Sequence, residues 1–252
     1  MAKHRALHPI RLARDQVLVR YYDHGGRERL ASLQEAGLLR FEDLPPAREI
    51  PSYAGQRHTP GRYWSASGNR MVGYESWLEG QWMRLLDFDP TVANFVSQPF
   101  ILEGVDQDGH WLHVPDLFAR RTDGTVMLVD VKADRFAATP RATRQRERTE
   151  NACRTLGWDY QWVTEPDPLT IATVSWLAGY RRPLNAAAPL ADPILDLARS
   201  PIPIGQLVSF QRAPEIARPV VYHLMWHHRL LFDATLPLRD TTLVRASPGG
   251  TR

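Results

Sequence analysis

The chain of 252 residues has one cysteine, Cys153, and almost no lysine. A single cysteine excludes an intramolecular disulfide and a cysteine-ligated zinc cluster, and it favours a reducing, cytoplasmic setting. Lysine occurs only at Lys3 and Lys132, so the other 29 of the 31 basic residues are arginine. Lys132 lies inside an apolar strand pattern, where a charge is unexpected, and lysine supplies a compact ammonium that arginine does not.

Long apolar runs and glycine-rich phosphate loops are also lacking. No stretch approaches the ~20 apolar residues of a membrane-spanning helix, and the first residues are not followed by the apolar segment of a secretory signal. We therefore expect neither a membrane-spanning helix nor a secretory signal. Because a glycine-rich phosphate loop is lacking, we also expect no hydrolysis of nucleotide triphosphates. The 43% apolar and 23% charged residues are typical of a globular protein. The net charge of +3 permits a polyanionic partner without requiring one.

Three regions are expected along the chain. Residues 1–70 are poorly periodic apart from a short helix over 27–37, and we predict an arm that packs on the main domain. Residues 71–166 predict a mixed sheet flanked by helices, an α/β sandwich, with this order of elements: helix 74–87, strands 92–98, 100–102, 111–119 and 125–131, helix 139–157, strand 158–163. Residues 167–252 predict a small, mainly helical, winged-helix-like domain: helices at 169–180, 193–198, 204–210 and 219–227, then a hairpin of 229–232 with 242–244.

Four charged positions in the middle region stand out. Glu79 falls on or beside the apolar stripe of the first helix, where a carboxylate is costly unless it is paired or binds a metal. Asp130 and Lys132 alternate with Val131 on one strand, so both project to the same face. Asp116 follows Pro115 on the preceding strand, and the turn at Asp123-Gly124 brings the two strands together.

The loop length decides how Asp116 and Asp130 meet. A two-residue loop at 123–124 places Asp116 opposite Val131. A three-residue loop at 122–124, with a left-handed glycine and a bulge, places Asp116 opposite Asp130, and we predict this register. Two close carboxylates in an apolar setting are stable only when one is protonated or a cation lies between them.

Oxygen ligands with open positions suit Mg²⁺, with Mn²⁺ able to substitute. The predicted ligands are Glu79, Asp116, Asp130 and Val131, and Lys132 is predicted to stabilise negative charge on a phosphodiester during hydrolysis. A solvated aspartate in a hairpin and a chance Asp-x-Lys are the plain alternatives for single residues. The ordered combination favours a metal-dependent nuclease centre with Glu79, Asp116, Asp130 and Lys132 as catalytic residues.

The order Glu…Pro-Asp…Asp-x-Lys resembles the PD-(D/E)xK superfamily of restriction-endonuclease-like folds. More closely, the chain is similar to the TnsA family, the endonuclease subunits of heteromeric transposases. The resemblance spans roughly residues 50–165 and rests on these runs: Val72-Gly-Tyr-Glu-Ser-Trp-Leu-Glu79, Leu85-Leu-Asp-Phe-Asp-Pro90, Gln98-Pro-Phe100, His113-Val-Pro-Asp116 and Val129-Asp-Val-Lys132. In the family pattern the helical acid belongs at Glu79, and Glu75 is the reserve choice. Well-known members carry Gln at the position of Asp130, which leaves details of metal coordination open.

The resemblance implies DNA transposition and recombination. A TnsA-like hydrolase cuts the 5′ ends of the element in double-stranded DNA, a TnsB-type DDE transposase handles the 3′ ends, and a TnsC-type ATPase regulator usually contacts the C-terminal part of TnsA. The implied location is the cytoplasm, at the nucleoid. Two other functions stay open: a stand-alone restriction or repair nuclease, and a DNA- or protein-binding module with a decayed site.

Several further residues carry weaker signals. A basic face next to the predicted site indicates phosphate contact or an ordinary solvated surface: Arg135, Arg141, Arg144, Arg146 and Arg148. Residues 219–228 are expected to pack as a core helix, with a DNA-recognition helix as the alternative. His223, His227 and His228 have helical spacing but no evident fourth ligand, so we expect no metal there. His113 is either a neighbour of Asp116 within the site or an ordinary strand residue.

Overall fold

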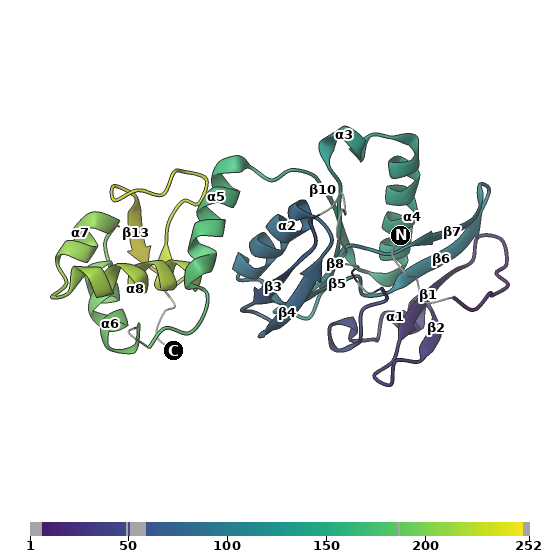
Figure 1. The fold of residues 1–252 in the computed structure, drawn as a ribbon, viewed down its shortest axis with the longest axis horizontal. Coiled ribbons are helices and arrows are strands. Elements are labelled where there is room, and N and C mark those ends of the chain that lie inside the picture. The colour runs from purple at the N-terminus through teal and green to yellow at the C-terminus, as the bar shows by residue number, and fades with distance from the viewer. Residues whose placement is uncertain (1–6, 49, 51–58, 186, 249–252) are drawn as a thin grey trace. The chain divides into compact units, whose positions relative to one another are not determined.

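The computed structural model describes residues 7–48, 50, 59–185 and 187–248. The chain divides into two compact units. The first unit comprises Met1–Asp87 and Thr91–Glu165, and the second comprises Phe88–Pro90 and Pro166–Arg252. The first unit combines helices with parallel and antiparallel strands, and the second combines helices with antiparallel strands, so the protein is a mixed α/β structure (Figure 1).

Two four-stranded sheets and a hairpin form the first unit. The core sheet has the order β10-β9-β8-β5, with β9 and β10 parallel and the other neighbours antiparallel. The second sheet has the order β2-β1-β6-β7, and β3 pairs with β4 alone. The strands are β1 (Val17–Tyr22), β2 (Glu28–Ser32), β3 (Gly61–Ser65), β4 (Arg70–Tyr74), β5 (Val92–Ser97), β6 (Ile101–Asp106), β7 (Gly109–His113), β8 (Leu117–Arg121), β9 (Val126–Val131) and β10 (Asp159–Val163).

The helices of this unit are α1 (Leu33–Ala36), the 3₁₀ turn η1 (Phe41–Asp43), α2 (Trp77–Phe88), α3 (Asp134–Ala137) and α4 (Pro140–Leu156). The Thr139 side chain caps α4, and Gly157, with φ of +68°, ends it in the left-handed conformation that glycine adopts without strain. These caps confirm the helix predicted over 139–157. Helix α2 begins at Trp77, three residues later than predicted.

The two faces of the core sheet pack against different helices. Alternate side chains, such as Phe118 and Leu128, meet Cys153 of α4 in one apolar cluster. The intervening side chains, such as Leu117, meet Met83 of α2 and the β3–β4 hairpin in another. Helices α2 and α4 thus lie on either side of β5 and β8 (Figure 1). Burial on both faces fixes which side chains point to which helix.

Two predictions for this unit were wrong. The strand expected over 111–119 is two strands in different sheets, β7 and β8, because Pro115 has no N–H to donate to a continuing ladder. The helix expected over 27–37 begins as strand β2, which pairs with β1, and only Leu33–Ala36 is helical. Residues 17–32 of the predicted arm therefore supply two strands of the second sheet.

The second unit packs helices against a small sheet. Its elements are α5 (Pro168–Leu177), the 3₁₀ turn η2 (Ala178–Tyr180), α6 (Ala187–Leu197), β11 (Ile202–Pro203), α7 (Ile204–Ser209), α8 (Pro214–Trp226), β12 (Leu230–Leu231) and β13 (Leu243–Ala246). The pairing of β12 with β13 confirms the predicted hairpin, and β11 joins it in the order β11-β13-β12.

Helices α6 and α8 begin earlier than predicted, because Pro193 and Pro219 lie inside them rather than at their starts. Leu224, Met225 and Trp226 of α8 are buried, as expected of a core helix. In the described part of the chain, no helix combines the length and the apolar character needed to cross a membrane.

Candidate active site

The β8–β9 hairpin sets the position of the two aspartates. Gly124 has φ of +87°, and the Arg121 N–H donates to Thr125 O at 2.9 Å, which closes a loop over residues 122–124. The register pairs Leu117 with Val129, so the next positions outward are Asp116 and Asp130. This is the three-residue register predicted from the sequence, and it places both aspartates at the same end of the sheet.

Asp116 stands where β8 begins. Its Oδ2 accepts a hydrogen bond from the Val131 N–H at 2.7 Å, and its backbone carbonyl accepts from the Gln98 N–H at 3.0 Å. Its Oδ1 has no partner among the residues that the structure describes. Burial raises the pKa of the Asp116 carboxyl well above its usual range, and the charges of Asp130 and Glu79 raise it further. The Val131 N–H and Lys132 oppose this pKa shift without cancelling it.

Asp130 is held from several directions. Its side chain is 1% exposed, and its oxygens accept from His113 Nε2 at 3.0 and 2.9 Å, from the Tyr160 hydroxyl at 2.8 Å and from the Asp116 N–H at 3.3 Å. Burial and the charge of Asp130 raise the pKa of Tyr160. Asp130 shares its strand face with Leu128, toward α4, and it is not among the residues that line the neighbouring cleft.

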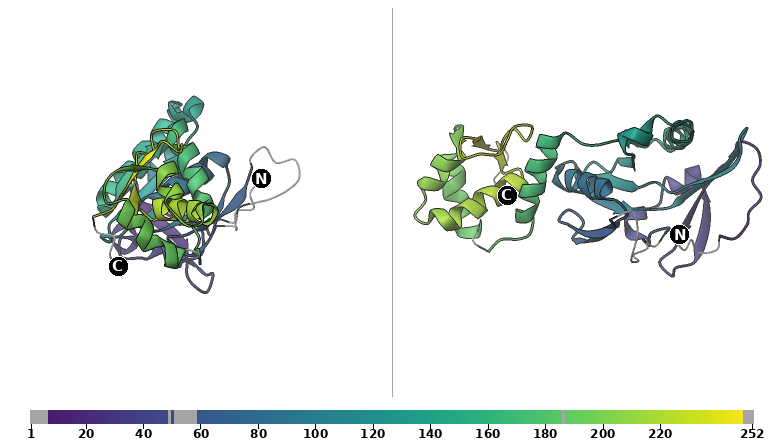
Figure 2. Two further views of the ribbon diagram at one scale, coloured as in Figure 1. Left: turned by 90° about the vertical axis from the view of Figure 1, so that its left-hand side faces the viewer. Right: turned by 45° about the horizontal axis from the view of Figure 1, so that its top comes forward.

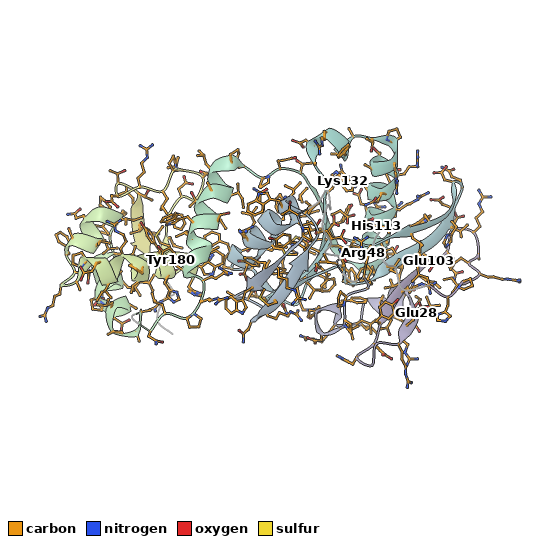
Figure 3. All side chains as sticks on the ribbon, viewed as in Figure 1. Glu28, Arg48, Glu103, His113, Lys132 and Tyr180 are labelled. Carbon is orange, nitrogen blue, oxygen red and sulfur yellow. The ribbon has the colours of Figure 1, made fainter. Side chains whose placement is uncertain are left out.

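Lys132 follows directly after β9. Its backbone N–H donates to Val163 O at 2.8 Å, which holds this end of β9 against β10. Its side chain lines the cleft together with Asp116 and His113. Figure 3 labels Lys132 and His113 on the ribbon. Among the described residues Lys132 forms no ion pair, so its charge is not paired with any of the described carboxylates of the cleft.

Glu79 and Glu75 enter the cleft from the start of α2. Glu79 Oε2 accepts from the Glu75 N–H at 2.9 Å, and Oε1 accepts from the Ser76 hydroxyl at 2.8 Å. Burial is the largest cause of its raised pKa, and the Glu75 charge adds to it, while these hydrogen bonds and Arg48 act the other way. Glu79 thus caps its own helix as well as facing the site.

Glu75 has an unused oxygen. Arg48 donates to its Oε2 at 2.5 Å, whereas its Oε1 is buried with no hydrogen-bond partner in the described structure. A buried carboxylate oxygen without a partner is costly, so it marks a place where a positive group binds favourably. Glu79 and its reserve Glu75 therefore both lie at the cleft, and it is Glu75 that carries a free oxygen.

The cleft that joins these residues has a volume of about 900 Å³. Its acidic side chains are Glu75, Glu79 and Asp116, and Val131 also lines it. Its basic side chains are Arg48, Lys132, Arg135 and Arg141. Acidic groups thus lie beside basic ones in one cleft, as a site needs in order to bind a cation and an anionic substrate together.

A divalent cation fits this donor set in part. Among the described residues, no three histidine, cysteine, aspartate or glutamate side chains converge as a complete set of metal ligands. Nevertheless, Asp116 Oδ1 and Glu75 Oε1 are carboxylate oxygens without hydrogen-bond partners among the described residues, and burial, with the charges of Asp130 and Glu79, raises the pKa of Asp116. Such hard oxygen ligands suit Mg²⁺, which keeps several waters rather than requiring an all-protein cage.

Two contributors were not assigned by sequence reasoning. The sequence leaves two interpretations open for His113 and gives no signal for Tyr160, yet both side chains hydrogen-bond to Asp130. In the other histidine group, His223 Nδ1 donates to Tyr180 O at 2.8 Å. The expectation of no metal at His223, His227 and His228 stays a prediction.

The sequence matches no protein-family model and no curated protein. The residues of the cleft are therefore the basis for assigning a function.

Proposed function

We propose that this chain is a Mg²⁺-dependent DNA endonuclease with a restriction-endonuclease-like core. One observation carries the proposal: Asp116, Asp130 and Lys132 stand at adjacent strand ends, and the pKa of Asp116 is raised first by burial and then by the charges of Asp130 and Glu79. A divalent cation beside close, buried carboxylates would stabilise their charged forms.

The topology supports the same proposal. Helix α2 precedes β5, β8 and β9, and helix α4 connects β9 to the parallel strand β10. This helix–sheet–helix arrangement is what the resemblance to PD-(D/E)xK enzymes implies, and the second sheet is an insertion between β5 and β8 together with residues 17–32.

Each residue has a distinct part in the proposed reaction. Asp116 and Glu75, with Glu79 and Val131 close by, hold the cation through oxygen atoms. When bound, Mg²⁺ supplies charge neutralisation at a phosphate and activation of water for attack on phosphorus. Lys132 stabilises the negative charge that develops on the phosphate oxygens. Asp130, fixed by His113 and Tyr160, adds the negative charge that attracts the cation and accepts the Asp116 N–H.

The particular enzyme that we infer is a TnsA-like subunit of a heteromeric transposase, which cuts 5′ transposon ends with TnsB-type and TnsC-type partners. In the second unit, the element order α6, β11, α7, α8, β12, β13 and the sheet order β11-β13-β12 support a winged-helix-like module. Arg218 of α8 is paired with Asp240, and Ile216 is 49% exposed. The TnsC-type partner is assigned to this unit because the resemblance implies that it contacts the C-terminal part of the chain.

Cleavage of end-labelled transposon-end DNA tests the proposal. Wild-type protein with Mg²⁺ and the transposase partner is expected to nick the 5′ ends, and Asp116→Asn is expected to abolish nicking while the protein stays folded. Glu147→Gln, an exposed acid on α4 outside the cleft, is the matched control and is expected to cleave normally. Cleavage without any partner would instead indicate a stand-alone restriction or repair nuclease.

A non-catalytic DNA-binding module is the competing function. The observation that favours it is the occupied carboxylate of Asp130, which in this structure bonds His113 and Tyr160. Absence of cleavage under all metal and partner conditions, with DNA binding retained, supports this second function and contradicts the first.

A further inference from the structure

Four arginines of α3 and α4 form two sets that differ in their partners. Arg148 donates to Asp106 at 2.6 and 3.0 Å and lies over the Trp111 ring, 5.3 Å from its centre. Arg144 lies 3.7 Å from Asp108. These pairs attach α4 to the turn between β6 and β7, so both arginines already have an acidic partner.

Arg135 and Arg141 differ from Arg144 and Arg148 in two ways: both line the cleft, and neither has an acidic partner in the described part of the chain. Both are also exposed. Arg135 belongs to α3 and Arg141 to the first turn of α4, the two helices that follow Lys132 along the chain. Figure 2 shows these helices, in teal, in two further views. Unpaired guanidinium groups at the rim of a polar cleft are available to bind phosphate oxygens.

An exposed aromatic ring lies between these arginines along the chain. Phe136 is 48% exposed, lines the same cleft, and has the Arg135 guanidinium 4.8 Å from its ring centre. The short helix that carries it is fixed at its first residue, since the Asp134 N–H donates to Glu165 Oε2 at 2.9 Å. The ring is thus presented to the cleft from an anchored segment rather than buried in the core.

We propose that Arg135, Phe136 and Arg141 hold a DNA strand in which a base is unpaired. The two guanidiniums bind backbone phosphates, and the Phe136 ring stacks on the base, the combination that single-strand binding surfaces use. The cleft, at about 900 Å³, is near the upper end for a drug-sized ligand and therefore suits a few nucleotides of one strand. This proposal rests on the proposed nuclease function and specifies its substrate as locally opened DNA.

Equilibrium binding without cleavage tests the proposal. The full chain is titrated in EDTA into three labelled DNAs of one sequence: a duplex, a single strand, and a duplex with a short unpaired segment. The wild type is expected to bind the two DNAs with unpaired bases more tightly than the duplex. Phe136→Ala is expected to weaken those two by about tenfold and to leave the duplex unchanged. Leu112→Ala, another exposed apolar residue of the cleft, is the control and keeps the preference.

The arginines are tested by salt dependence. Arg141→Gln is expected to weaken binding of all three DNAs and to reduce the slope of log affinity against log salt by about 0.7 to 0.9. Arg146→Gln makes the same charge change on the same helix, at an exposed position outside the cleft, and is expected to leave the slope unchanged. Equal slopes for the two variants contradict the assignment of Arg141.

The outcomes separate this proposal from the nuclease proposal. Equal wild-type affinity for all three DNAs, or an equal loss for all three in Phe136→Ala, overturns the unpaired-base proposal even when DNA is cleaved. Retained preference for unpaired DNA, without cleavage in Mg²⁺ in the presence of the transposase partner, overturns the nuclease proposal alone. Thermal unfolding of each variant confirms that a loss of affinity does not reflect a loss of fold.

Discussion

Two clusters of buried charged side chains in the first unit differ in how completely their polar atoms are paired. In the second sheet, Arg20 is 1% exposed and donates to Glu103 Oε2 at 2.9 and 2.6 Å, to Glu28, and to the His8 carbonyl at 3.0 Å. His110 bonds the remaining Glu103 oxygen at 2.8 Å. Figure 3 labels Glu28 and Glu103 in this sheet, and Lys132 and His113 at the cleft.

The cleft cluster is paired less completely. Asp116, Asp130 and Glu79 lie near one another, and Lys132 forms no ion pair among the described residues. Within the same residues, Asp116 Oδ1 and Glu75 Oε1 have no hydrogen-bond partner. A buried charge is stabilised only by partners that replace its water. The paired cluster therefore stabilises the fold, whereas the incompletely paired cluster gains stability when a ligand binds to it, which is a property of functional sites.

The largest expected effect is on catalysis. Lys132→Met removes the free ammonium with little change in length, and it is expected to lower the cleavage rate about 10²- to 10³-fold, as loss of a group that stabilises transition-state charge does. Because Lys132 has no ion pair in the described structure, the free energy of unfolding should change little. Single-turnover cleavage and urea unfolding measure the two quantities. A large loss of stability with this variant would show that Lys132 stabilises the fold, as Arg20 is expected to do.

The next effect is on stability. Arg20→Met leaves Glu103 buried without its partner, and it is expected to lower the free energy of unfolding by about 3–5 kcal/mol. Urea unfolding measures the change, and residual cleavage by the folded fraction should stay near the wild-type value. Arg29→Gln breaks the exposed ion pair with Asp23, so it is the control, with an expected loss below about 1 kcal/mol.

Part of this contrast was predictable from the sequence. The turn at Asp123-Gly124 determined the register, and alternation along β9 determined that Asp130 and Lys132 share a face. The partners of Asp130 were not predictable in the same way, because His113 and Tyr160 come from different strands, 17 and 30 residues away. Local periodicity carries no information on such contacts, which depend on how two sheets and α4 pack.

The contact between Arg20 and Glu103 was still less predictable from local periodicity, since the two residues are 83 positions apart. The region before residue 70 has little periodicity, and its strands β1 and β2 are specified by pairing with β6 and with each other. Pro115 was visible in the sequence, however, and its missing N–H was sufficient reason to divide the strand expected over 111–119.

Binding of a divalent cation is expected to stabilise the folded protein through the cleft cluster and not through the cluster around Arg20. Mg²⁺ or Mn²⁺ at a hundredfold excess over its dissociation constant is expected to stabilise the wild type by about 2.7 kcal/mol, since it binds only the folded site. Asp116→Asn should lose this stabilisation, whereas Arg20→Met, though less stable, should retain it. Thermal unfolding with metal and with EDTA gives the comparison. Equal stabilisation of the two variants would place the cation elsewhere.

The smallest expected effect is on the pH dependence of the metal-free protein. Burial and the neighbouring carboxylates raise the pKa of Asp116 above its value in the unfolded chain, so the folded state binds this proton more tightly. Its contribution to stability is therefore present at a pH below the unfolded-state pKa and is lost as pH rises through the folded-state pKa.

In EDTA, stability should accordingly fall from acidic toward neutral pH by more in the wild type than in Asp116→Asn, which cannot ionise there. Urea unfolding at a series of pH values measures the difference between the two proteins, which cancels the titration of groups that they share. Arg20→Met keeps Asp116 and its neighbours, so its curve should lie lower but run parallel to that of the wild type. A parallel curve for Asp116→Asn instead would mean that the charge of Asp116 is compensated in the folded protein, and the contrast between the two clusters would disappear.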